Sequence, residues 1–120
     1  NWLLMAEYRT WKPSHPDINK YWNTRYHRDA LPELMKAVYY VRDQDFSKIK
    51  KPSLVFYTEN DTVIFQDEVK KKFLEIVSDK KKIVEIPSPA HVLAGVLTSP
   101  QTTQMVITEM TNWLESIGVR

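Results

Sequence analysis

The 120-residue sequence predicts an α/β fold whose regular part occupies residues 48–120. Two observations support this class: β-favouring apolar runs at 53–58 and 82–86, and an amphipathic helical pattern after each run. Strand and helix therefore alternate as βαβα, which predicts two parallel strands joined by a right-handed crossover. Residues 1–47 show only helical patterns and loops, so the chain is expected to divide near Pro52.

Three helices are expected before that division. The first runs from Trp2 to Thr10 and is stopped by the proline-containing stretch 12–16. Asp17 is a plausible N-cap for the second helix. Pro32 suits the first turn of the third, where its missing N–H is harmless. The side chains expected to share one face are Ile18, Tyr21 and Trp22 in the second helix, and Leu31, Leu34, Met35, Val38 and Val41 in the third.

The second half contains the clearer elements. The run 53–58 is typical of a strand buried on both faces of a parallel sheet. The helix expected over 68–77 carries an apolar stripe, and the strand at 82–86 is closed by prolines. Ser99 is the expected N-cap of a last helix, which Gly118 ends. The apolar stripes of these two helices are Val69, Phe73, Ile76 and Val77, and then Val106, Met110, Trp113, Leu114 and Ile117.

Two parallel strands alone make an unstable sheet, because parallel sheets need both faces covered and several neighbouring strands. The sequence also begins at Asn1 with a pattern typical of a helix interior, which suggests that the natural N-terminus lies upstream. We therefore expect either that further strands precede this segment or that the chain pairs with a second copy. Self-association of the 120-residue chain follows from the exposed apolar strand edge.

Composition excludes several classes of function. The formal net charge is only +2 and the basic residues are spread along the chain, so no nucleic-acid partner is expected. The absence of cysteine excludes disulfides and a thiol nucleophile. Three scattered histidines predict no metal site, and no glycine-rich loop indicates a phosphate-bearing cofactor, so we expect no cofactor. No apolar run approaches the ~20 residues of a membrane span, and localisation is not readable from the sequence.

Two polar residues follow the predicted strands at corresponding positions. Asp61 comes after the first strand and His91 after the second. Functional groups collect where neighbouring strands of an open α/β sheet end, so these side chains are expected to meet. An ionised aspartate beside a histidine fixes the imidazole tautomer and stabilises the imidazolium. The competing interpretations are a turn or cap role for Asp61 and simple loop packing for His91; His15 and His27 are expected to be ordinary surface residues.

The order of these features resembles the last two βα units of the α/β-hydrolases. The shared features are an Ile49-x-x-Pro52 lead-in, an apolar strand, an acid, a helix, a second strand, a histidine and a closing helix. The resemblance implies that Asp61 and His91 are the acid and base of a Ser-His-Asp triad. It also implies that residues 48–120 are the C-terminal βαβα portion of a three-layer α/β/α hydrolase sheet, and that 1–47 form a helical cap or lid. The family often has glycine before the acid and the histidine, where this chain has Glu59 or Asn60, and Ala90.

The nucleophile of such an enzyme is missing. Gly95 and Gly118 are the only glycines, so no G-x-S-x-G motif is possible. The expected function is therefore the C-terminal part of an esterase- or lipase-like serine hydrolase that acts on a small-molecule acyl substrate, with the 120-residue chain itself inactive. The alternative is a non-catalytic, hydrolase-like α/β module that binds a partner or a small molecule.

Overall fold

The computed structural model describes residues 6–13 and 15–119. The chain divides into two compact units, Asn1–Gln44 and Asp45–Arg120. In the described part, each unit contains a two-stranded sheet, antiparallel in the first and parallel in the second, and four α-helices accompany the two sheets. The fold is therefore mixed α/β, with the parallel strands confined to the second unit.

The first unit is built on a pair of short strands. β1 (Tyr8–Thr10) pairs antiparallel with β2 (Arg25–His27), and α1 (Ile18–Tyr21) lies in the connection between them. The expectation of a helix from Trp2 to Thr10 is wrong at Tyr8–Thr10; residues 1–5 lie outside the described part. Tyr and Thr favour extended backbone, and pairing with a strand far along the chain outweighs a short helical pattern.

The two later helices of this unit are confirmed. Asp17 occupies the N-cap position of α1 but its side chain makes no capping hydrogen bond, and Pro32 lies in the first turn of α2 (Ala30–Arg42). α1 is a single turn that buries Ile18 but leaves Tyr21 and Trp22 exposed. No residue of α2 is buried. Its apolar stripe has the helical period that the sequence predicts, and Leu34, Met35, Val38 and Val41 are all exposed.

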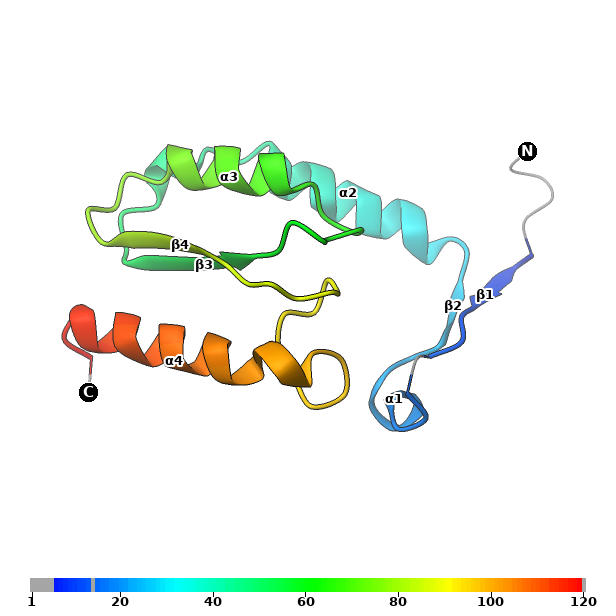
Figure 1. Cartoon of the computed structure of the whole chain (residues 1–120). Coiled ribbons are helices and arrows are strands. Elements are labelled where there is room, and N and C mark those ends of the chain that lie inside the picture. The colour runs from blue at the N-terminus through cyan, green and yellow to red at the C-terminus, as the bar shows by residue number, and fades with distance from the viewer. Residues whose placement is uncertain (1–5, 14, 120) are drawn as a thin grey trace. The chain divides into compact units, whose positions relative to one another are not determined.

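The second unit has the predicted βαβα order. β3 (Ser53–Tyr57) pairs in parallel with β4 (Lys81–Glu85), α3 (Gln66–Glu75) connects them, and α4 (Pro100–Ser116) follows. A 3-10 turn, η2 (Phe46–Lys48), precedes β3. The two helices lie on opposite faces of the sheet (Figure 1), which makes three layers of secondary structure.

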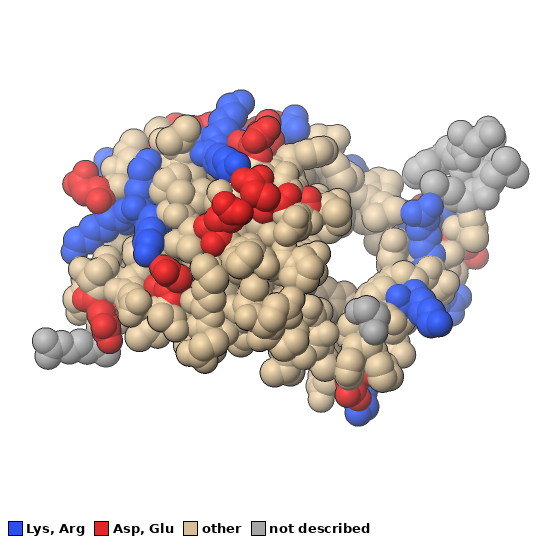
Figure 2. All heavy atoms as spheres, viewed as in Figure 1, with Lys and Arg blue, Asp and Glu red and all other residues tan. Residues whose placement is uncertain are grey.

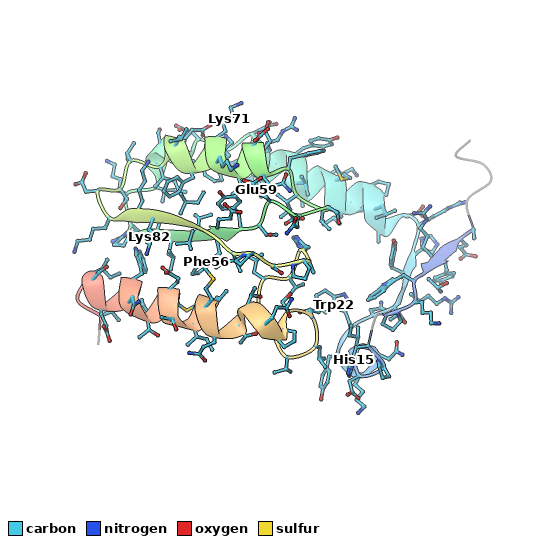
Figure 3. All side chains as sticks on the ribbon, in the orientation of Figure 1. His15, Trp22, Phe56, Glu59, Lys71 and Lys82 are labelled. Carbon is cyan, nitrogen blue, oxygen red and sulfur yellow. The ribbon has the colours of Figure 1, made fainter. Side chains whose placement is uncertain are left out.

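Side-chain alternation assigns one face of the sheet to each helix. Lys82 of β4 donates to Glu109 of α4 at 2.7 Å, so this face looks toward α4. Phe56 of β3 pairs with Val84, two residues beyond Lys82, and therefore lies on the same face (Figure 3). The buried apolar residues of this unit are Ile76, Ile86 and Val106. In the stripes predicted from sequence, Val77 and Met110 are instead exposed.

The helix ends have specific causes. Lys81 on the opposite sheet face donates from Nζ to the carbonyls of Phe73, Leu74 and Ile76. A cation at the carbonyl end of a helix is favourable, so Lys81 stabilises the end of α3, which lies at Glu75, before Val77.

At the end of α4, Gly118 has φ of 86°. Its N–H donates to Glu115 O, and the Val119 N–H donates to Leu114 O, both at 3.0 Å. This is a Schellman ending, which favours glycine, and it confirms Gly118 as the end of the helix. None of the described helices is long and apolar enough to cross a bilayer.

Candidate functional site

The acid sits in a tight turn that begins where β3 ends. The Asp61 N–H donates to Thr58 O at 3.3 Å and closes the turn. The Oδ1 of Asp61 then accepts the N–H groups of Val63 at 2.7 Å and Ile64 at 2.9 Å. This side-chain-to-backbone arrangement is why an aspartate suits the position. No described non-glycine residue has a positive φ, so this turn forms without glycine.

The second carboxylate oxygen of Asp61 faces the histidine. Nδ1 of His91 lies 2.8 Å from Asp61 Oδ2, so the predicted meeting of the two side chains at one end of the sheet is confirmed. An ionised carboxylate only accepts hydrogen bonds, so Nδ1 of His91 donates to Asp61, and in the neutral form of the ring the lone pair is then on Nε2. The Asp61 side chain is 11% exposed and that of His91 42%. Within the described residues, Nε2 of His91 has no hydrogen-bond partner, so the basic nitrogen is available to a substrate or a nucleophile.

The environment keeps Asp61 ionised. Burial raises the pKa of Asp61, but hydrogen bonds from His91 and from two backbone N–H groups lower it by more. The pKa of Asp61 therefore lies below its ordinary value of 3.8. At neutral pH the carboxylate is charged, which is the state that orients a neighbouring imidazole.

The histidine lies on a loop that follows β4. The loop begins with Ser88 N–H donating to Ile86 O at 2.7 Å, a tight turn around Pro87. Ser88 is fully buried, and its Oγ accepts from Ala90 N–H at 3.3 Å, directly before His91. The loop is therefore fixed at its start by a buried hydroxyl.

The acid turn and the histidine loop are also joined directly. The carbonyl oxygen of Ser88 accepts from Thr58 Oγ1 at 2.8 Å and from Asn60 Nδ2 at 3.0 Å. Thr58 is 1% exposed, and it comes from the end of β3. Sequence reasoning missed this connection, although a polar residue close to the end of each apolar run, Thr58 and Ser88, was the signal for it. The connection fixes the distance between the two strand ends, and with it the separation of Asp61 and His91.

Polar contacts on the outer side of the turn support the acid. Gln66, the first residue of α3, donates from Nε2 to the carbonyls of Glu59 at 3.1 Å and Asp61 at 2.7 Å. The carboxylate of Glu59 lies 2.5 Å from Lys70 Nζ. That hydrogen bond is the main reason why the pKa of Lys70 is raised. Glu59 is thus engaged by a lysine, and Asp61 is the carboxylate that serves the histidine.

Apolar side chains surround the exposed part of the acid turn. A hollow of about 300 Å³ lies along residues 61–66. Val63, Ile64 and Phe65 are exposed to 68%, 47% and 78%. Consecutive exposed apolar residues beside the Asp61–His91 pair are uncommon on a soluble surface and are typical of a contact or binding surface.

The two other histidines belong to the first unit. His15 accepts from the N–H of Asp17 at 3.1 Å, and His27 lies between Glu7 and Asp29 at the surface of the first unit. No group of three or more histidine or acidic residues placed to hold a metal ion occurs in the described part of the chain. On the face in Figure 2, acidic and basic side chains are interspersed. None of the described serines bonds to His91.

Comparison of the chain with protein-family models, with curated proteins and with solved structures finds no match.

Proposed function

We propose that this chain supplies the acid and the histidine of a Ser-His-Asp triad in an esterase- or lipase-like acyl hydrolase. One observation carries the proposal: the 2.8 Å contact between His91 Nδ1 and Asp61 Oδ2 at the ends of adjacent parallel strands, with Nε2 of His91 open. The serine nucleophile and the oxyanion hole come from outside these 120 residues, since the sequence has no G-x-S-x-G motif.

Each residue then has a defined step. Nε2 of His91 takes the proton from the serine hydroxyl as it attacks the acyl carbon, and gives it to the leaving alcohol. Asp61 keeps the other ring proton on Nδ1 and stabilises the imidazolium formed in between. In the second half-reaction His91 takes a proton from the water that attacks the acyl-enzyme and returns it to the departing serine oxygen, which releases the carboxylic acid product and restores the serine.

The acyl part of the substrate is apolar in this proposal. The exposed side chains of Val63, Ile64 and Phe65 lie on the turn that carries Asp61, so an acyl chain near the reacting carbon meets apolar surface. Burying such surface on binding is favourable by roughly 25 cal/mol per Å². The order of acid and histidine along the chain also supports a hydrolase of this kind.

The test uses the full-length product of the gene and a short p-nitrophenyl ester. We expect an acyl-enzyme burst, abolished by His91→Ala because the general base is removed. His27→Ala, a surface histidine of the first unit, is the matched control and should leave kcat unchanged. Full-length His91→Ala protein with wild-type kcat would exclude the triad assignment.

The second candidate is a non-catalytic α/β module that binds a partner or a small molecule. It is favoured by the absence of any serine bonded to His91 in the described residues. The two candidates differ in the sequence that precedes Asn1 in the gene. A strand followed by G-x-S-x-G there supports the hydrolase, and an upstream sequence without a nucleophile supports the binding module.

A further inference from the structure

Ser99 occupies the N-cap position of α4 but does not cap it. No side-chain capping hydrogen bond is present, so the cap role expected from the sequence is wrong. Ser99 is fully buried, and its Oγ donates instead to the carbonyl of Val92. The Ser99 side chain, which at this position usually caps the helix, therefore points toward the loop that carries His91.

The hydroxyl of Ser99 also meets that of Ser88, with the two oxygens 3.0 Å apart. Ser99 uses its only proton on Val92 O, so at this contact it accepts and Ser88 donates. Ser88 in turn accepts from Ala90 N–H at 3.3 Å. The result is one directed chain of hydrogen bonds, from Ala90 N–H through Ser88 and Ser99 to Val92 O.

This chain begins at the residue before His91 and ends at the residue after it. The proton of Ser88 has two other acceptors in reach, Ala90 O at 3.0 Å and Val92 O at 3.3 Å, and both also belong to residues that flank the histidine. Every arrangement of the two hydroxyls thus restrains the same three-residue segment. In a low-dielectric interior, the hydrogen bonds of such a chain polarise and strengthen one another.

The start of α4 is stabilised by other groups. The Ser99 N–H donates to Gly95 O at 3.0 Å, and the Ser99 carbonyl accepts from Thr103 Oγ1 at 2.9 Å. Thr103 Oγ1 also accepts from Gly95 N–H at 2.9 Å. Gly95 has a φ of 120°. None of these contacts uses the Ser99 hydroxyl, so that hydroxyl remains available to the loop that carries His91.

We propose that Ser99, together with Ser88, is a positioning residue that fixes the backbone around His91 so that Nδ1 meets Asp61. Its significance for catalysis rests on the proposed hydrolase function, but the positioning itself does not. Without the two hydroxyls, three backbone groups beside His91 lose buried partners, and the loop relaxes until water or a new contact satisfies them.

Three substitutions separate positioning from capping. Ser99→Thr keeps the donor. Ser99→Gly removes it but remains an acceptable N-cap residue, whereas Ser99→Ala removes both. If Ser99 acted as a cap, Gly would behave almost like Ser. If Ser99 acts by positioning, Ser99→Gly and Ser99→Ala both lose the contact between His91 and Asp61, and only Ser99→Thr keeps it.

The readout is the imidazole of His91, observed by NMR in the ¹⁵N-labelled protein at neutral pH. We expect the Nδ1–H resonance, and the ¹⁵N shifts of the Nδ1–H tautomer, to be retained in Ser99→Thr and lost or averaged in Ser99→Gly and Ser99→Ala. Ser116→Ala is the matched control, because Ser116 also donates to a carbonyl in α4, that of Trp113, but far from the loop. A folded Ser99→Ala protein with the wild-type Nδ1–H resonance would overturn the proposal, as would retention in Ser99→Gly.

A variant that does not fold is replaced by Ser99→Cys, which has a similar volume and a weaker donor. An intermediate loss of the Nδ1–H resonance supports the proposal, and a wild-type resonance contradicts it. In the full-length enzyme Ser99→Ala should lower kcat by about 10- to 100-fold with KM unchanged, since a misplacement of about 1 Å costs on that order. Absence of any ester hydrolysis would reject the hydrolase but leave the NMR result, and hence the positioning role, standing.

Discussion

The hydroxyl of Thr58 lies 2.8 Å from the carbonyl oxygen of Ser88, and both residues are buried. This contact joins the end of β3 to the loop that follows β4. Asn60 adds a second donor to the same carbonyl. The separation of Asp61 from His91 is therefore set by the framework beneath them as well as by their own hydrogen bond.

Thr58→Val tests that framework, because valine has nearly the same shape and lacks the hydroxyl. The Asn60 N–H loses its contact with Thr58 Oγ1, and the Ser88 carbonyl keeps only the Asn60 amide. We expect the free energy of unfolding to fall by about 1–3 kcal/mol, the usual cost of leaving buried polar groups with fewer partners. Urea denaturation measures this change in the free energy of unfolding. Thr62→Val, at an exposed position in the same turn, should change stability by less than about 0.5 kcal/mol.

The pH dependence of stability should report the Asp61–His91 pair. The pKa of Asp61 is lowered in the folded protein, so the unfolded state binds the proton more readily. The stability contributed by this carboxylate is then fully present above its ordinary pKa of 3.8, and is lost as the pH falls through the lower pKa of the folded state. Chemical unfolding from pH 6 downward measures it, and Asp61→Asn should remove this part of the acid sensitivity. Asp79→Asn, at an exposed position, is the control and should retain this acid sensitivity. If the unfolding free energies of wild type and Asp61→Asn depended on pH in the same way, the assignment would be contradicted.

Activity of the full-length protein should depend on Asp61 without help from its acidic neighbour. Glu59 is close in sequence, but its carboxylate is bonded to Lys70, so it is not free to orient His91. Asp61→Asn is expected to lower kcat by up to about 10⁴-fold, as the corresponding change does in a serine protease. The double variant with Glu59→Gln should match Asp61→Asn alone. A further large loss in the double variant would show that Glu59 does substitute.

The sequence predicts the site better than it predicts the support around it. Asp61 and His91 could be paired because each follows an apolar strand, and parallel strands bring equivalent ends together. The role of Ser99 could not be predicted, because a serine before Pro100 is the usual signal of a helix cap, and the alternative acceptor, Val92 O, depends on a loop conformation. The same holds for β1, whose three residues become a strand only through long-range pairing with β2.

The edge of β3 that faces away from β4 is not paired with any described strand. Among the described residues, β4 is the only strand that pairs with β3. Ser53 donates its N–H toward β4, at Lys80 O, so alternation directs the N–H groups of Leu54 and Phe56 to the other edge. β3 has no charged residue, whereas β4 contains two lysines and a glutamate. Charges are a common protection of strand edges, and β3 has none.

We therefore expect the 120-residue chain to self-associate through β3 at micromolar concentrations, where exposed strand edges commonly pair. Sedimentation velocity should show a species larger than the 14.2 kDa monomer. Leu54→Pro removes one outward N–H and should shift the protein toward monomer, because proline cannot donate to a new strand. Leu54→Ala is the control: it shortens the side chain but keeps the N–H, so association should persist if backbone pairing is responsible. Association that Leu54→Ala abolishes and Leu54→Pro leaves intact would place the contact on side chains instead of the strand edge, and a monomeric wild-type chain at these concentrations would exclude pairing through β3 altogether.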